Sequence, residues 1–253
     1  KPGSANRLYE YRKQICIDSL TGKDKSRSYE SLCRDIVNAF DTLPIQEGLR
    51  KPRVGIVGEI LVKYMPLANN HLVELLEKEG AEAVVPDLMD FMNYSLYNGE
   101  YKHQFLGTSW TTEATAELGI HAIAMLRQPA IRALKNSKRF EPPMDIRQVA
   151  ELAKPFLSLG NQYGEGWFLT GEMAELITTG VPNIVCIQPF ACLPTHVVGK
   201  GAIKALKTAY PQSNIIAVDY DPGASEVNQL NRIKLMLSAA KKALAEEEAA
   251  PAK

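Results

Sequence analysis

The chain has 253 residues, of which 45% are hydrophobic and 23% are charged, a composition typical of globular proteins. Lys and Arg together number 29, and so do Asp and Glu, so the formal net charge is zero. This balance argues against nucleic acid as a partner. No apolar run reaches the roughly 20 residues that span a bilayer, and no secretory signal is visible. With only four cysteines, we expect a cytoplasmic protein with reduced thiols and no membrane partner.

The two ends of the sequence indicate a piece of a longer polypeptide. The chain begins KPGSANRLYEYRKQ, without an initiator Met, and ends in the charged, Ala-rich stretch KKALAEEEAAPAK. We therefore expect a domain fragment, although processing of a precursor would leave the same ends.

Residues 1–50 are predicted to form a helical lead-in. Apolar residues recur at helical spacing from about Leu8 to Leu43, and the polar stretch TGKDKSRS divides them into two helices. The segment PIQEGLRKP then serves as a linker to the next region.

Residues 51–88 have the pattern of the first βαβ part of an α/β domain. RVGIVG at 53–58 is apolar on both faces, which is typical of a parallel strand covered by helices. A helix capped by Asn69 and ending at Gly80 follows, and AEAVVPD at 81–87 predicts the second strand.

Residues 89–180 contain no convincing strand and are predicted to be a helical insertion or cap. Helices are expected at 113–134 and 145–154, the second of them with a capping-box pair of Asp145 and Gln148. EGWFLTGEMAELITTG leads out of the insertion as a further helix.

Residues 181–248 resume the alternation and form the second βαβ part. The strand NIVCIQ at 183–188 is followed by a helix at 195–210, the strand NIIAVDY at 214–220 and a last helix from Ser225. The whole pattern predicts an α/β fold, an open parallel Rossmann-like or flavodoxin-like sheet with a helical insertion and N-terminal helices.

The loops that follow the strands are the candidate site, because open parallel sheets bind ligands beyond the carboxyl ends of their strands. Glu59 follows the first strand, Gln188 ends the third, and Asp219 and Asp221 flank the turn after the fourth. We expect one aspartate to order that turn and the other to meet a ligand or a partner subunit. A solvated or salt-bridged Glu59 fits the sequence equally well. GIVGEI lacks the third glycine of a dinucleotide fingerprint.

Cys192 and His196 are the candidate metal-binding residues at this edge. Cys192 lies in IQPFACLPTH, near the start of a helix, where the thiolate form is favoured. The C-x₃-H pair alone is a weak metal signature, because zinc sites need four ligands and no second pair is present. Cys186, inside the strand, is expected to pack as a small hydrophobe, and Cys16 and Cys33 are interpreted in the same way. The residue types alone do not decide whether Cys192 is a functional thiol or a packing residue.

Four blocks of the sequence together resemble a known family. They are RVGIVGEILVKYMPLANNHLVELLEKEGAEAVVPDLMDF, YGEGWFLTGEMAELI, IQPFACLPTHVVGKG and IAVDYDPGASEVNQLNRIKLM, in this order between about residues 53 and 237. These blocks resemble the C-terminal, dehydratase-like region of large activase-type proteins related to the 2-hydroxyacyl-CoA dehydratases.

The resemblance implies a module of an ATP-driven electron-transfer system. In such proteins, ATPase modules of the acetate-kinase/actin type drive an electron to low potential. A dehydratase-like region receives it on iron–sulfur clusters for the dehydration of 2-hydroxyacyl-CoA thioesters or similar reductions. This chain has no P-loop, so ATP would bind only on absent modules. The implied partners are the ATPase modules of the same parent polypeptide and acyl-CoA, and a homodimer is left open.

The resemblance also implies roles for individual residues. Cys192 lies where a cysteine would ligate a cluster, but the loop VPDLMDF lacks the cysteine that the dehydratase subunits tend to show there. One well-placed cysteine cannot hold a [4Fe–4S] cluster alone, so either a cluster is shared with another module or chain, or the dehydratase fold is retained here without its cluster. The expected roles are catalytic for Glu59, Asp219 and Asp221, and cofactor-binding for Gln188, Cys192 and His196, with Cys192 as the metal ligand.

Two other functions fit the sequence. A cofactor-free docking or regulatory module would position the ATPase domains against a partner, and the single well-placed cysteine favours it. An independent CoA- or nucleotide-binding domain has only the fold in its favour, and a fold does not fix a function. The sequence leaves open whether the chain is itself an enzyme.

Overall fold

The computed structural model describes residues 3–46, 48–221 and 223–249. Contacts divide the chain into two compact units. Unit 1 comprises residues 1–49 and 117–143, and unit 2 comprises residues 50–116 and 144–253. Glu47 of the predicted linker and the last four residues of the Ala-rich end lie outside the described residues.

Unit 2 is built on a parallel sheet, which in the described residues has four strands in the order β2-β1-β3-β4. The strands are β1 (Arg53–Gly58), β2 (Glu82–Val84), β3 (Asn183–Gln188) and β4 (Asn214–Asp219). This order is that of the first four strands of flavodoxin-like sheets, so the predicted open parallel α/β fold is confirmed. The second strand is shorter than the sequence predicts, since Val85 and Pro86 already belong to the connection.

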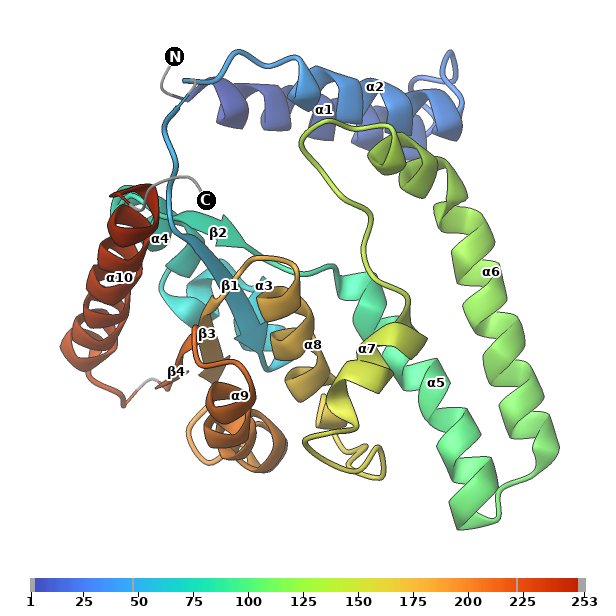
Figure 1. Ribbon diagram of the computed structural model, residues 1–253. Helices are drawn as coiled ribbons and strands as arrows, with labels where there is room; N and C mark the ends of the chain where they lie inside the picture. The colour runs from blue at the N-terminus through green and yellow to red at the C-terminus, as the bar shows by residue number, and fades with distance from the viewer. Residues whose placement is uncertain (1–2, 47, 222, 250–253) are drawn as a thin grey trace. The chain divides into compact units, whose positions relative to one another are not determined.

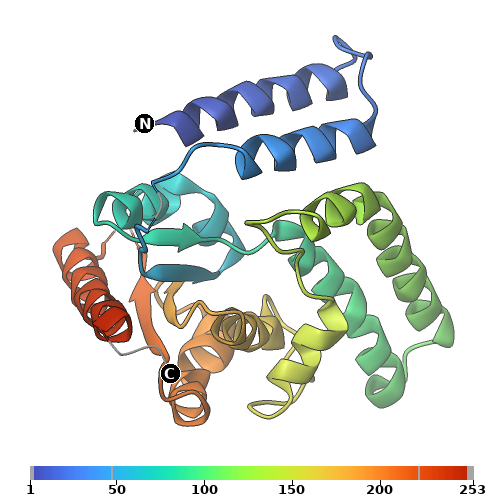
Figure 2. The same ribbon diagram turned by 45° about the horizontal axis from the view of Figure 1, so that its top comes forward.

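Helices cover both faces of the sheet (Figure 1). On one face, α4 (Leu72–Lys78) and α10 (Glu226–Ala249) bury apolar side chains against β1, β3 and β4. On the other face, α8 (Gly166–Thr178) and α9 (Ile203–Ala209) do the same. Figure 2 shows α10 and α9, in red and orange, on either side of β4. Burial on both faces explains why β1 and β3 are apolar without alternation.

A third cluster joins α8 to α5 (Leu88–Leu106) and α7 (Ile146–Ala153). Trp167 of α8 is fully buried there, and its Nε1 donates a hydrogen bond to Asn98 Oδ1 at 2.9 Å. Its ring meets the Tyr94 ring edge-on, with centroids 5.1 Å apart. Trp167 is therefore a packing residue. The capping box of Asp145 and Gln148 at the start of α7 is present as predicted.

Short helices occupy the connections next to the carboxyl edge of the sheet. After β1 come α3 (Ile60–Tyr64) and a 3₁₀ turn, η1 (Pro66–Asn69), so α4 begins later than the sequence predicts. The N-cap position of α4 is His71 and not the predicted Asn69, although Asn69 Oδ1 accepts the N–H of Leu72 at 3.0 Å. The predicted helix 195–210 is divided into a π-helical turn, η2 (Thr195–Gly199), a 3₁₀ turn, η3 (Lys200–Ala202), and α9.

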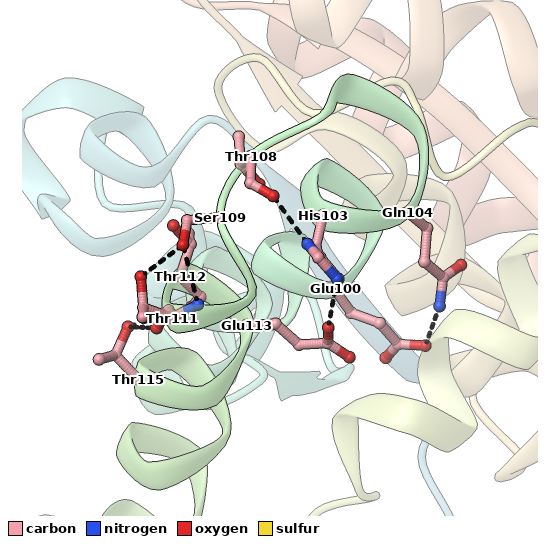
Figure 3. A network of polar contacts seen from close by, with 9 residues as sticks. All are labelled: Glu100, His103, Gln104, Thr108, Ser109, Thr111, Thr112, Glu113 and Thr115. Atoms are coloured by element: carbon pink, nitrogen blue, oxygen red, sulfur yellow. Dashed lines mark hydrogen bonds and ion pairs between the residues drawn. The ribbon is translucent and has the colours of Figure 1, made fainter.

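The turn between α5 and α6 (Trp110–Lys135) is held by local polar contacts (Figure 3). His103 Nδ1 lies 2.7 Å from the carbonyl oxygen of Thr108, and its Nε2 lies 3.5 Å from Glu113 Oε2. The N–H of Thr111 donates to Ser109 Oγ at 3.2 Å in the first turn of α6. These contacts satisfy polar groups at two helix ends, so His103 has a structural role.

Unit 1 contains α1 (Ser4–Leu20), α2 (Tyr29–Asp41) and the C-terminal part of α6. Asp41 accepts the hydroxyl of Ser137 at 2.8 Å, and Arg139 donates to the carbonyl oxygens of Phe40 and Leu43. The predicted insertion 89–180 is thus divided between the units, because 117–143 contacts the N-terminal helices while α7 and α8 pack in unit 2.

Candidate functional site

The carboxyl ends of β1 and β3 mark the topological switch point of the sheet. From β1 the chain continues to β2 on one side, and from β3 it continues to β4 on the other. In such sheets the connections diverge there and leave a crevice where ligands bind. Gly58 ends β1 with φ 146°, and a Cβ on it would lie 1.9 Å from the carbonyl oxygen of Ile187. Only glycine lets the two strand ends approach so closely.

Three of the predicted site residues meet on the β3–β4 side of this switch point. Gln188 is fully buried, and its Nε2 donates to Asp219 Oδ1 at 2.6 Å. The same Nε2 lies 3.4 Å from His196 Nε2, while His196 Nδ1 lies 2.9 Å from the carbonyl oxygen of Cys192. Donation from Nδ1 to that carbonyl leaves Nε2 as the acceptor for Gln188. One tautomer of His196 therefore satisfies both contacts.

Gln188 Oε1 is a buried acceptor for which no hydrogen-bond partner is found among the described residues. Rotating the Gln188 amide by half a turn would exchange Nε2 and Oε1 and place Oε1 against the carboxylate of Asp219. The observed orientation is therefore the favourable one. An unsatisfied buried acceptor costs about 1–3 kcal/mol, which a donor from a ligand would offset.

Cys192 lies on a loop with an unusual backbone. Ala191, directly before it, has φ 59°, in the left-handed region that residues with a Cβ rarely adopt. The Cys192 carbonyl accepts the N–H of His196 at 3.0 Å and the Thr195 hydroxyl at 3.1 Å, which fixes the loop to η2. The Cys192 residue is partly exposed. Strained backbone of this kind is found more often at functional loops than elsewhere.

Glu59 and Asp221 have local structural roles. Glu59 Oε2 accepts the N–H of Val62 at 2.8 Å and so caps α3. Asp221 is exposed, and its Oδ1 accepts the N–H of Gly223 at 3.2 Å, so it is the aspartate that orders the turn. Asp219 is the one that joins Gln188, and its carbonyl accepts Gln229 Nε2 at 2.8 Å. Catalytic roles for these carboxylates remain predictions.

A buried charged cluster on the β1 side was not predicted from the sequence. Lys63 of α3 and Glu172 of α8 form an ion pair at 2.6 Å, with both side chains 1% exposed. Glu165 is also buried, and its Oε1 accepts the N–H of Ile60 at 3.1 Å. Burial raises the pKa of Glu172, although the charge of Lys63 opposes this rise. The sequence gives no signal for this burial, because Glu172 and Glu175 are three residues apart in α8 and their spacing is that of a solvent-facing side.

Two further groups connect this cluster to the rest of the site. Burial, followed by the charges of Asp90 and Glu172, raises the pKa of Glu175 to about 7. Burial, followed by the charges of Glu172 and Asp219, raises the pKa of Cys186 to about 12. Cys186 is therefore a protonated packing thiol, as predicted, and the charges of both the Lys63–Glu172 cluster and Asp219 act on it.

The donor set does not fit a complete iron–sulfur cluster. Within residues 3–46, 48–221 and 223–249, no group of three or more His, Cys, Asp or Glu side chains could hold a metal ion. Of the four cysteines, Cys192 is the one in a loop at the carboxyl edge.

No family model, curated protein or solved structure matches the chain. In the part of the chain that the structure describes, no helix combines the length and apolar character needed to cross a membrane. The fold and the site thus define an α/β protein with a group of interacting polar residues at the switch point of a parallel sheet.

Proposed function

We propose that this chain is the dehydratase-like α/β module of an activase-type protein. It would serve in ATP-driven, low-potential electron transfer to the dehydration of a 2-hydroxyacyl-CoA or a similar reduction, in a cytoplasm with reduced thiols. One observation carries the proposal. The blocks that resemble this family supply the residues at the carboxyl edge, with Gln188, Cys192 and His196 in one block and Asp219 in another.

Cys192 would contribute one thiolate to a cluster that is shared with another module or chain. Its partial exposure and its position on a loop support this role, because a shared ligand must be reachable from outside. His196 and Gln188 would hold the loop, since His196 contacts the Cys192 carbonyl and Gln188 contacts His196. Acyl-CoA would bind in the crevice, and ATP would bind only to the ATPase modules of the parent polypeptide.

The test is the iron and acid-labile sulfide content after anaerobic purification and reconstitution, for the chain alone and for the chain with those ATPase modules. We expect Cys192→Ala to lose the iron while keeping its circular dichroism spectrum, because a loop thiol contributes little packing. Cys16→Ala, which removes a partly exposed cysteine of α1, is the matched control and should keep the iron. Full iron content in Cys192→Ala would show that Cys192 is not a ligand.

The second candidate is a cofactor-free docking or regulatory module that positions the ATPase domains against a partner. Among the described residues, no group of three or more His, Cys, Asp or Glu side chains could hold a metal ion, and this observation favours the docking module. In this case neither preparation would bind iron, and the chain would bind the ATPase modules with the same affinity before and after Cys192→Ala.

A further inference from the structure

An open groove of about 560 Å³ in unit 2 is lined by β4, by η3 and α9, and by α10. Figure 1 shows β4 as the last strand of the sheet, between α9 and α10. Ile215 and Ala217 of β4 are only 2% and 5% exposed, whereas Ile203 of α9 and Ile216 of β4 are partly exposed. The groove therefore offers side chains, rather than the backbone of β4, to a partner.

The exposed side chains of this groove are basic. Lys200, Lys204 and Lys207 are exposed on the wall formed by η3 and α9, and Arg232 is exposed on α10. Among the described residues that line the groove there is no acidic side chain, and none of the four cations forms an ion pair with a described residue. Like charges three or four residues apart destabilise a helix, so a negatively charged partner would stabilise this wall.

This concentration of positive charge contrasts with the composition of the whole chain, whose formal net charge is zero. Residues 176–218 contain no Asp or Glu, and neither do residues 227–245. These two stretches supply both walls and the floor of the groove. Charge of one sign gathered on one face attracts partners of the opposite charge and raises their rate of association.

The spacing of the three lysines matches a helical partner. They recur at i, i+4 and i+7, so they form one row of roughly 10 Å along the η3–α9 segment. Carboxylates at the same spacing on another helix form a row of the same length. Ile203 and Ile216 add apolar surface to the groove, which the apolar face of an amphipathic helix would contact.

We propose that this groove binds an acidic amphipathic helix of a partner protein. Carboxylates of that helix would pair with the lysine row, and its apolar residues would pack on Ile203 and Ile216. A helix lying along β4 would also cover the outer edge of the sheet, as proteins commonly do. A second copy offering the same face does not fit, because four cations would face four cations. The inference rests on neither proposed function, since it uses no cysteine, cluster or ATPase module.

The test is fluorescence anisotropy with two labelled, alanine-based peptides of about 16 residues, a length at which such sequences form helices. The first carries glutamates at helical spacing beside a row of leucines. The second has the same glutamates and leucines but prolines in place of two central alanines, which break the helix without changing the charge. We expect the first peptide to bind at least about tenfold more tightly than the second, and to bind more weakly as salt is added.

Variants of the chain test the two kinds of contact. Lys204→Glu with Lys207→Glu should weaken binding of the first peptide at least about tenfold. Lys102→Glu with Lys241→Glu, two exposed lysines outside the lining of the groove, is the charge-matched control and should bind like the original chain. Ile216→Thr keeps the charge and the β-branched shape but removes apolar surface, so it should weaken binding at least about threefold. Circular dichroism checks that each variant is folded.

Four results would overturn the proposal. They are no binding of the first peptide, equal binding of the two peptides, unchanged binding by Lys204→Glu with Lys207→Glu, and unchanged binding by folded Ile216→Thr. Equal binding of the two peptides would reduce the groove to a site of simple charge attraction. Inorganic tripolyphosphate that binds more tightly than the first peptide would also overturn it, because the groove would then belong to a phosphate-bearing ligand.

Discussion

Glu175 illustrates how a single partly buried carboxyl group couples folding to pH. Its Oε1 accepts the N–H of Met144 at 3.3 Å, and burial together with the charges of Asp90 and Glu172 raises its pKa from 4.5 to about 7. The folded chain thus binds this proton more tightly than the unfolded chain does. The stability from Glu175 is fully present below pH 4.5 and is lost as the pH rises through about 7.

Glu175→Gln should remove this pH dependence, because glutamine keeps an acceptor for Met144 without a charge. Between pH 5 and pH 8 we expect the free energy of unfolding of the original chain to fall by on the order of 2 kcal/mol more than that of the variant. Urea denaturation at the two pH values measures the difference. Glu141→Gln, at an exposed position, should behave like the original chain. Parallel pH profiles for the chain and Glu175→Gln would contradict the assignment.

The sequence predicts one half of the site and misses the other for a physical reason. Gln188 and Asp219 end visible strands and His196 follows one, and parallel strands bring their carboxyl ends together, so their convergence can be predicted. The pairing of Lys63 with Glu172 depends on how α3 packs against α8, and no local pattern encodes that packing.

At the level of elements, α3 and α8 are joined by a buried ion pair. Helix α3 has only five residues, so little of its stability comes from its own hydrogen bonds. Lys63 Nζ lies 2.6 Å from Glu172 Oε1, and both side chains are removed from water. Two opposite charges in such a place stabilise each other, and removing one leaves the other buried without compensation.

Lys63→Met should lower the free energy of unfolding by about 3–5 kcal/mol at neutral pH. The double variant Lys63→Met, Glu172→Met should recover much of this loss, because it removes both buried charges and keeps apolar volume. Chemical denaturation of the single and double variants gives the coupling between the two sites. Additive losses in the double variant would show that the two charges do not depend on each other.

Strand boundaries could be predicted better than the helical connections. The strands β1 and β3 have the predicted bounds, because short apolar runs next to Gly and Pro define them. The segment 195–210 was predicted as one helix, but its first part is a π-helical turn and a 3₁₀ turn. Periodicity does not separate these from an α-helix.

At the scale of the whole molecule, the two units differ in the size of their cores. Among the described residues of unit 1, the buried side chains are those of Leu32, Cys33 and Ile120. Unit 2 contains the three large apolar clusters around its sheet and around Trp167. Helical patterns in the sequence predict the elements of 89–180, but they do not reveal which neighbours bury them, so the division into units was not predicted.

Hydrogen exchange should reflect this difference. We expect amides of α1 and α2 to exchange at least about 100 times faster than those of β1 and β3, because few buried contacts oppose local opening. Mass spectrometry of peptic peptides over minutes to hours measures the rates. Equal protection of the two units would mean that unit 1 gains stability from a source other than its own core.

The assembly of unit 1 from two separated segments has a consequence for synthesis. The partner of Phe40 and Leu43 is Arg139, which the ribosome adds long after α2 has emerged. At about 5–20 residues per second, roughly 5–20 s pass between the two segments. During this interval α1 and α2 leave the exit tunnel without the segment that closes their unit. The nascent chain then offers the amphipathic helix α2 to any chaperone or protease near the tunnel exit.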